Sequence, residues 1–566
     1  MKNSLLIVFT LIVFGNLFSQ CDTSRYRSPL FGGVYTHSNV KYGEAPVWNV
    51  PYNDTDLYMD IFEPLSDPQA KRPLMIWVHP GGFLLGDKTA DDMVALCDSF
   101  ARRGYVTASV GYRLGFNPLS SGSSERAVYR GLQDLHAAIR YLYEFADIYG
   151  IDTNYTLVGG SSAGSVAALH LAYLDQDEAP TSVYGDFLTP DLGLIESSGN
   201  NYVHEVKLAG LVNLWGALGD SSFIDIDETV PSLHIHGVDD ATVPFGVGVP
   251  FGLGTLPPTH GSRAIHNQLD VWGTPHQFEP FPGLGHEFHG ADNGTFNNPP
   301  NAYWDTIFNL VDQHYLSIVL PESVSIQGDS VGCKQSQSIY SVASAADETP
   351  CWNVIDGQVL SGLDTDTIVV LWDNVTSGVV SCQLVNEIAA VSSLSTFNID
   401  LFDLPIVPNV NFYMSGGQAM FSTDDNSIVE WDFGDGTTDM GSAVSHEYTQ
   451  SGIYTITYTS ENQFGCAASM DTSFMIDLFA SDFSLSQDFS TAIEVYPNPA
   501  TDFVTITNTS GELVQLSILN LSGQTVLEHV LENTETRIDL TDLSSGIYVV
   551  YIQNSKGTVF ERLIVQ

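Results

Sequence analysis

The most informative part of the chain is the stretch "TLVGGSSAGSVAALHLAY" (residues 156–173), in which an apolar run passes through small residues into an alanine-rich run. This order predicts a buried strand that turns sharply into a helix. Such a turn crowds its backbone against neighbouring elements, so it needs small residues two positions before and after its centre. Gly160 and Gly164 meet that need, which makes Ser162 the exposed middle residue. Ser161 is expected on the strand side, facing the core or the turn.

The G-x-S-x-G pattern also occurs at residues 328–332, around Ser330. A bare match is weak evidence in a chain with 49 glycines. A β pattern with no helix follows Ser330, whereas a helical pattern follows Ser162. We therefore interpret Ser162 as the nucleophile and reject Ser330.

Strand-like and helical patterns alternate between about residues 57 and 320. This alternation predicts a doubly wound, mostly parallel sheet covered by helices on both faces, so the fold class is α/β. The strand-like runs are residues 57–64, 74–80, 105–113, 155–161, 208–217, 231–237 and 276–283. The helical patterns are residues 91–104, 125–149, 162–174, 263–272 and 303–315.

A nucleophilic serine needs N–H donors for the oxyanion that forms when it attacks. The run "LMIWVHPGGF" (residues 74–83) ends a buried strand with two glycines, whose backbone can approach a ligand closely. We expect the N–H groups of Gly81 and Gly82, with that of Ala163, to form the oxyanion hole.

The serine also needs a histidine as base and a carboxylate that orients it. The strand "SLHIHG" is followed by Asp239 and Asp240, and Asp240 is the preferred acid because it lies after the turn. The last strand is followed by "GLGHEFHG", which offers His286 as the base and His289 as the alternative. We interpret His170, His234, His236 and His314 as structural residues.

Residues 57–320 resemble the α/β-hydrolase superfamily, and specifically its carboxylesterase and hormone-sensitive-lipase-like branch. The segments that carry this resemblance are "LYMDIFEP", "WVHPGGF", "GSSAG", "HGVDDATVP" and "GLGHE". The resemblance implies a Ser162–His286–Asp240 triad that cleaves carboxylic esters through an acyl-enzyme, with no cofactor and no metal. Pro80 stands where the family usually has glycine and lacks an N–H, so Gly81 and Gly82 are expected to supply the donors.

After residue 320 the helical periodicity disappears, and short runs rich in Val, Ile, Thr and Tyr predict three successive all-β sandwiches. "WDFGDG" resembles a polycystic-kidney-disease (PKD) domain, and residues 333–386 resemble a PKD-like or immunoglobulin-like module. "VYPNPATDFVTI" and "DLSSGIYVVYI" resemble the type A C-terminal sorting domain of the type IX secretion system in Bacteroidetes. The expected domains are residues 1–20 (signal peptide), 21–320 (hydrolase), 321–402 (PKD-like), 403–480 (PKD), 481–492 (linker) and 493–566 (sorting domain).

The immunoglobulin-like resemblance implies a Cys333–Cys382 disulfide across the sheets, with Cys333–Cys351 as the alternative. Cys97 lies in a helical pattern and is expected to be a buried small hydrophobe. Asp432, Asp435 and Asp439 could bind calcium, but we favour a turn-forming role for them.

The first twenty residues carry Lys2 and a short apolar core, which is typical of a secretory signal peptide. Cleavage near Gln20 would leave Cys21 at the mature start, where a lipid anchor is the alternative that Gln20 disfavours. Together with the sorting domain, this predicts a protein that is secreted or held at the cell surface. The type IX machinery is the expected partner of residues 493–566, and a polysaccharide or the cell surface is the candidate partner of the PKD domains.

The chain has 19 Lys and Arg against 67 Asp and Glu, a net charge of −48, which repels phosphate backbones and excludes nucleic acid as a partner. The leading hypothesis is a secreted serine esterase. A serine peptidase of the same fold and a surface adhesin with an inactive hydrolase domain are the alternatives. The sequence does not choose between a sugar ester, a lipid and a polyester as substrate.

Overall fold

A computed structural model of the chain describes residues 21, 24–48, 53–185, 189–227, 229–415, 418–424, 426–476, 483–486, 493–509, 514–520, 524–531, 533–554 and 557–566. The predicted signal peptide, residues 1–20, lies outside the described residues. No helix in the described part of the chain is both long enough and apolar enough to cross a bilayer.

An eight-stranded sheet forms the centre of the N-terminal half, with the order β1-β2-β4-β3-β5-β6-β8-β11. Only β2 runs against the other seven strands, because it pairs antiparallel with both of its neighbours while the pairs from β4 to β11 are parallel. These strands are β1 (Val34–Pro46), β2 (Asp54–Pro64), β3 (Arg72–Val78), β4 (Val106–Val110), β5 (Ile151–Ser161), β6 (Gly210–Leu214), β8 (Ser232–Gly237) and β11 (His276–Phe281). Short strands outside this sheet are β7 (Ala217–Leu218), β9 (Val247–Gly248), β10 (Thr259–Gly261), β12 (Ala291–Asp292) and β13 (Thr295–Phe296).

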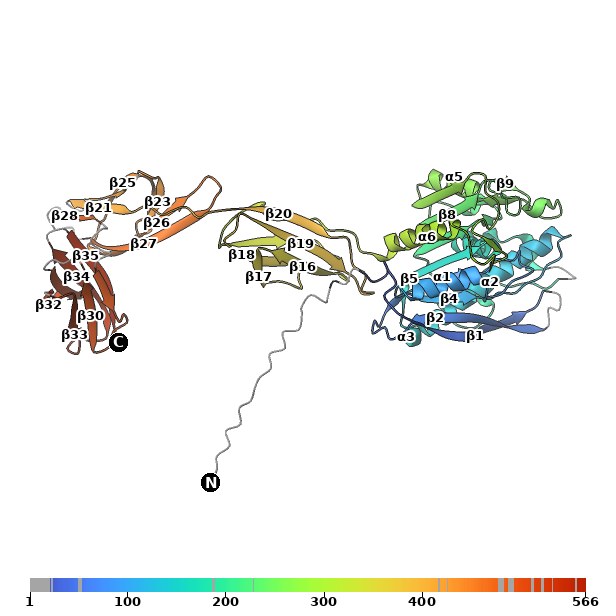
Figure 1. Ribbon diagram of the computed structural model, residues 1–566, viewed down its shortest axis with the longest axis horizontal. Coiled ribbons are helices and arrows are strands. Elements are labelled where there is room, and N and C mark those ends of the chain that lie inside the picture. The colour runs from blue at the N-terminus through green and yellow to red at the C-terminus, as the bar shows by residue number, and fades with distance from the viewer. Residues whose placement is uncertain are drawn as a thin grey trace, which may run out of the picture.

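Helices cover both faces of this sheet, as Figure 1 shows. One hydrophobic core joins the sheet to α2, α4 and α5, and a second core joins the opposite face to α1 and α6. Burial on both faces explains why β3, β4 and β6 contain no exposed residue. The helices are α1 (Asp91–Ala101), α2 (Ser121–Glu144), α3 (Ala146–Tyr149), α4 (Ala163–Tyr173), α5 (Ser262–Trp272) and α6 (Tyr303–Val319).

Three units of two facing sheets follow in the described C-terminal residues, so the predicted fold class is confirmed. The first unit contains β14 (Val331–Cys333), β15 (Gln337–Ser341), β16 (Thr349–Ile355), β17 (Gly357–Ser361), β18 (Thr367–Trp372), β19 (Ser377–Val385) and β20 (Ser395–Phe402). The second contains β21 (Val410–Ser415), β22 (Gln418–Thr423), β23 (Val429–Asp432), β24 (Thr438–Gly441), β25 (Ala443–Glu447), β26 (Gly452–Glu461), β27 (Ala467–Ile476) and β28 (Phe483–Ser486). The third contains β29 (Ile493–Tyr496), β30 (Phe503–Asn508), β31 (Val514–Asn520), β32 (Thr525–Leu531), β33 (Glu535–Asp539), β34 (Gly546–Asn554) and β35 (Gly557–Val565).

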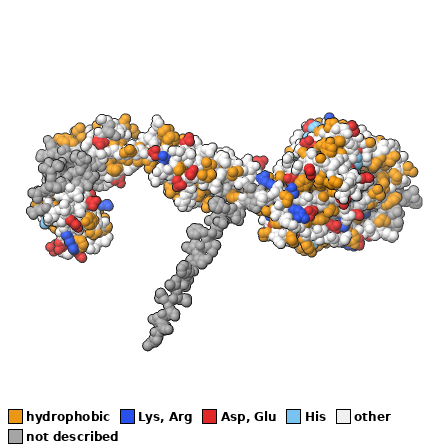
Figure 2. Space-filling model, viewed as in Figure 1, with side chains coloured by type: hydrophobic (Ala, Val, Ile, Leu, Met, Phe, Trp, Pro, Cys, Tyr) orange, Lys and Arg blue, Asp and Glu red, His pale blue; other side chains and the backbone are white. Residues whose placement is uncertain are grey.

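Acidic side chains lie dispersed over the face drawn in Figure 2. In the second unit, two of the three aspartates considered for calcium take part in turns, because Asp432 and Asp435 accept backbone N–H groups two residues ahead. Asp439 instead lies on β24, where its carboxylate accepts the N–H of Met440.

The expected linker, residues 481–492, needs a correction, because residues 483–486 form β28. This strand pairs antiparallel with β21 and lies at the edge of that sheet. The segment "FSLS" alternates apolar and polar residues with a period of two, which suits a strand. The serine-rich composition concealed that alternation. The other residues of the expected linker, 481–482 and 487–492, lie outside the described residues.

The expected disulfide Cys333–Cys382 and its alternative Cys333–Cys351 are both wrong. Cys333 is bonded to Cys466 of the second unit, and Cys351 is bonded to Cys21. The strand pleat explains why Cys351 does not face the core of the first unit, because Cys351 and the buried Trp352 are neighbours on β16 and face opposite sides of the sheet. A Cys21 sulfur in a disulfide has no bond left for a lipid.

Cys382 is a buried free thiol in the core of the first unit, and Cys97 is a buried free thiol on α1, as expected. Burial raises the pKa of both thiols, to about 11 for Cys382, so both remain protonated at neutral pH.

A loop of the first β unit is built into the core of the N-terminal α/β domain. Ile388 and Ala390, both fully buried, belong to the same hydrophobic cluster as α1 and α6. The Tyr26 hydroxyl donates to the Ile388 carbonyl at 2.7 Å, and Asn386 Nδ2 donates to the Val319 carbonyl at 3.0 Å. The N-terminal α/β domain and the first β unit therefore share one apolar core.

The disulfide pattern can be tested by peptide mapping. Digestion of the unreduced chain is expected to yield a peptide joining Cys21 to Cys351 and another joining Cys333 to Cys466. Alkylation after unfolding without a reductant should modify Cys97 and Cys382. Mass spectrometry that finds a Cys333–Cys382 peptide instead would contradict the structure.

Candidate functional site

Ser162 lies in the sharp turn between β5 and α4, with the left-handed φ of 53° that is uncommon for a residue with a side chain. The two flanking glycines make this turn sterically feasible. A Cβ on Gly160 would collide with the Gly164 backbone, and a Cβ on Gly164 would collide with the Val78 carbonyl at the end of β3. The spacing of the pattern therefore reflects two backbone contacts.

His286 connects Ser162 to Asp240. Its Nε2 lies 2.8 Å from Ser162 Oγ, and its Nδ1 lies 2.7 Å from Asp240 Oδ2. Because a carboxylate only accepts, Nδ1 carries the proton, which leaves Nε2 to accept the hydrogen bond from the serine hydroxyl. The three residues follow β5, β8 and β11, so the parallel sheet gathers them at the carboxyl ends of its strands.

Asp240 is buried and held by several donors. Its Oδ1 accepts the backbone N–H groups of Thr242 and Val243, at 2.8 and 2.9 Å. Burial alone would raise its pKa, but hydrogen bonds from His236 and His286 outweigh burial and hold the pKa well below the ordinary value. The carboxylate is therefore ionised at neutral pH.

His236, interpreted from the sequence as a structural residue, lies next to Asp240. Its Nε2 donates to the Val243 carbonyl at 3.0 Å and lies 3.3 Å from Asp240 Oδ2. Its Nδ1 lies 2.8 Å from the Ser262 hydroxyl, which fixes the ring from the other side. The only sequence signal was its position on β8, four residues before the acid.

The structure does not bring the alternatives into this arrangement. The Asp239 side chain is exposed, and its backbone N–H donates to the Leu284 carbonyl. His289 is buried, stacks on Trp215 with ring centroids 4.9 Å apart, and has Nε2 3.5 Å from Asp92 Oδ2. Ser161 faces the core as expected, where its hydroxyl accepts from Trp215 Nε1 at 3.0 Å.

The segment expected to form the oxyanion hole follows β3. Gly81 and Gly82 have φ values of 119° and 61°, which residues with side chains rarely adopt. Gly82 and Ala163 line the same cavity as Ser162, whereas Gly81 is not part of that lining. Pro80 instead presents its carbonyl, which accepts from His79 Nδ1 at 2.7 Å.

The cavity next to Ser162 is mostly apolar. The segment 245–261 contributes Pro250, Phe251, Leu256, Pro257 and Thr259 to its wall. The wall also contains Phe83, which follows the two glycines of the oxyanion segment. Three further aromatic residues lie outside any motif recognisable in the sequence: Phe116, Tyr129 and Phe223.

Comparison with known protein families divides the chain into matched parts. Residues 59–218 match the family model BD-FAE, residues 409–476 match the PKD domain, and residues 494–566 match the secretion system C-terminal sorting domain. These matches confirm the resemblances to an esterase-like α/β hydrolase, a PKD domain and a sorting domain.

Curated relatives match a shorter stretch. Carboxylesterase 3B of Mus musculus is 35% identical over 118 residues, which are 20% of each chain. Carboxylesterase 3 of Homo sapiens is 34% identical over 130 residues, which are 22% of each chain. The chain thus spans about a fifth of the length of these relatives.

Among solved structures, esterase 2 of Thermogutta terrifontis phosphorylated by paraoxon is similar, with 19% identity and a TM-score of 0.36. The match covers 51% of this chain and 95% of that one.

The turn at Ser162 leads to a stability prediction. Gly164→Ala places a methyl group against the Val78 carbonyl, and such overpacking is expected to destabilise the hydrolase domain by about 1–3 kcal/mol or more. Hydrogen-exchange mass spectrometry of the β5 and α4 peptides across a urea series would measure the loss. Gly254→Ala is the matched control, because nothing lies within 4 Å of its added Cβ. Equal stability of the two variants would contradict the packing argument.

His170 on α4 leads to a pH prediction. Burial lowers its pKa to about 4, and its Nε2 accepts the Gly219 N–H at 3.1 Å, which requires a neutral ring. Between pH 6.5 and 4 His170 is protonated in the unfolded chain but stays neutral in the folded chain, so its contribution to stability is lost as the pH falls. The difference in the free energy of unfolding between wild type and His170→Gln should decrease by up to about 1.4 kcal/mol per pH unit over that window. Urea unfolding at several pH values would show a constant gap if the prediction is wrong.

Proposed function

We propose that this protein is a secreted serine hydrolase that cleaves carboxylic esters. The observation that carries the proposal is the hydrogen-bonded series Asp240–His286–Ser162, which ends beside an apolar cavity. The carboxylesterase relatives and the BD-FAE match support an ester as the bond cleaved.

In the first half-reaction, Ser162 Oγ attacks the ester carbonyl carbon while its proton passes to His286 Nε2. The ionised Asp240 accepts from Nδ1–H and stabilises the imidazolium that forms. The tetrahedral intermediate then expels the alcohol, which takes the proton from Nε2, and an acyl group remains on Ser162.

In the second half-reaction, water attacks the acyl carbon and gives its proton to His286 Nε2. Collapse of the second intermediate returns that proton to Ser162 Oγ and releases the carboxylic acid. Each turnover consumes one ester and one water, and it requires no electron transfer.

The N–H groups of Gly82 and Ala163 are the proposed donors to the oxyanion, with Gly81 as the third member. Gly82 and Ala163 line the cavity beside Ser162, which supports their assignment. Loss of one such donor typically costs about 3–4 kcal/mol of transition-state stabilisation.

The apolar and aromatic wall suits a hydrophobic acyl or alcohol group, since burying apolar area favours binding. Residues 493–566 are proposed to direct the chain through type IX secretion, so that the hydrolase acts at the cell surface or beyond it.

The assignment predicts a specific pattern of lost activity. With a short-chain p-nitrophenyl ester and the full chain, Ser162→Ala should lower kcat by about 10⁶-fold. Asp240→Asn should lower kcat by roughly 10⁴-fold, because His286 then loses the acceptor that fixes its tautomer. Asp239→Asn is the matched control and should remain close to wild type, because its side chain is exposed.

A fluorophosphonate probe separates this proposal from its alternatives. Labelling should occur on Ser162 in the wild type and disappear in Ser162→Ala. An unlabelled wild type would indicate an inactive adhesin, and faster turnover of peptides than of esters would indicate a peptidase.

A further inference from the structure

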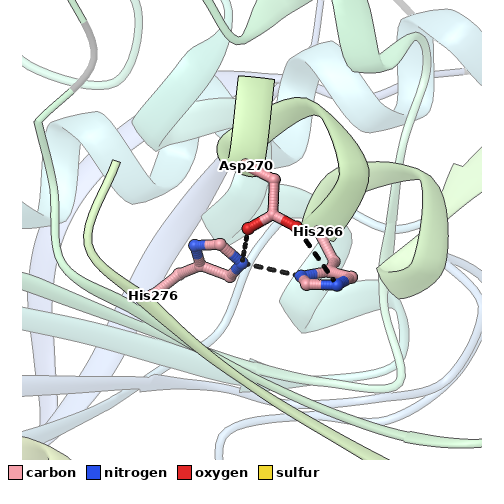
Figure 3. A group of neighbouring side chains, drawn as sticks. All are labelled: His266, Asp270 and His276. Atoms are coloured by element: carbon pink, nitrogen blue, oxygen red, sulfur yellow. Dashed lines mark hydrogen bonds and ion pairs between the residues drawn. The ribbon is translucent and has the colours of Figure 1, made fainter. Parts of the chain in front are cut away.

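Three potential metal ligands converge away from Ser162, at the junction of α5 and β11. His266 and Asp270 lie one helical turn apart on α5, and His276 is the first residue of β11. One ligand atom from each residue lies within 4.8 Å of the other two. Figure 3 shows the two rings and the carboxylate directed at one another.

The hydrogen bonds of this cluster define which nitrogens carry protons. His276 Nδ1 lies 2.8 Å from the Thr274 carbonyl, which can only accept, so Nδ1 carries the proton and Nε2 has a free lone pair. His266 Nδ1 lies 2.8 Å from that Nε2 and must donate to it.

That arrangement leaves the other side of His266 unsatisfied. In the neutral ring, Nε2 is then an acceptor, yet it lies 3.5 Å from Asp270 Oδ2, which is also an acceptor. Asp270 Oδ1 lies 3.7 Å from His276 Nε2, the nitrogen that already accepts from His266. His266 Nε2 and Asp270 Oδ2 are facing acceptors with no donor between them, which indicates a position suited to a cation.

Both favourable and opposing charges surround the site. The last turn of α5 presents the negative end of the helix dipole. Arg263 is the opposing charge, and its guanidinium lies over the rings of Phe245 and Phe278 at 5.2 and 5.3 Å.

The site is also preorganised. The Thr274 carbonyl fixes the His276 ring as an outer-shell partner would. Phe278 stacks on His266 with ring centroids 4.3 Å apart. Gly273 ends α5 in the left-handed conformation, so only a tight turn separates the helix from β11.

We propose that His266, Asp270 and His276 form a binding site for a divalent transition metal such as Zn²⁺. Two imidazoles and one carboxylate are a donor set that Zn²⁺ prefers, with water in the fourth position, whereas Ca²⁺ and Mg²⁺ prefer oxygen ligands alone. The bound ion replaces the hydrogen bond between the two rings. It joins α5 to β11, the strand whose carboxyl end leads to His286.

Titration of the metal-stripped full chain tests the site. Isothermal titration with Zn²⁺ should detect a site that weakens by about tenfold or more in His276→Gln and in Asp270→Asn. Zn²⁺ should raise the thermal midpoint of the wild type by about 2–4 °C and have a smaller effect on both variants. Co²⁺ bound to the wild type should show the intense visible bands of a tetrahedral site.

His204→Gln is the matched control, because His204 is also paired with a carboxylate, Glu144, at 2.8 Å. Asp270 is 62% exposed, so Asp270→Asn should fold even if the histidine variant does not. Zn²⁺ affinity and stoichiometry that are the same in wild type, Asp270→Asn and His204→Gln would overturn the proposal. Binding of Ca²⁺ or Mg²⁺ with equal strength would also overturn it.

Discussion

The site depends on one close backbone contact, the approach of Gly164 at the start of α4 to the Val78 carbonyl at the end of β3. This contact sets the direction in which α4 leaves the sheet and forces Ser162 into its left-handed conformation. The strained turn lifts the hydroxyl above the strand ends, where the loops after β8 and β11 also lie. Because the glycines bring the helix and sheet so close together, the position of the hydroxyl is set by packed backbone rather than by a mobile loop.

The electrostatics of the site follow from that rigid frame. Asp240 is buried but remains ionised, since two backbone N–H groups and two imidazoles stabilise its charge. An ionised, fixed carboxylate determines which nitrogen of His286 carries the proton. His236 lies beside Asp240, two strands from the strand that ends at Ser162, so it positions the carboxylate.

The α/β fold and the residues around Ser162 could be predicted because each follows from a local pattern that sterics enforce, such as the glycine spacing around the turn. Features that depend on contacts between distant parts of the chain could not be predicted from the sequence. The edge strand β1 has few apolar residues and is defined by its pairing with β2. Cys333 and Cys466 are 133 residues apart, and only the packing of two β units brings them together. The contact between His236 and Asp240 likewise required the fold of the loop after β8.

The loop carrying Ile388 and Ala390 changes how the chain divides into independent parts. Both side chains pack into the apolar core of the α/β domain, and Asn386 caps the end of α6 by donating to the Val319 carbonyl. Truncation after residue 320 would expose the apolar surface that these two side chains cover, and the truncated chain would be expected to self-associate through it. The smallest autonomous unit therefore extends to about residue 402, because the first β unit is packed firmly against the α/β domain rather than linked to it flexibly.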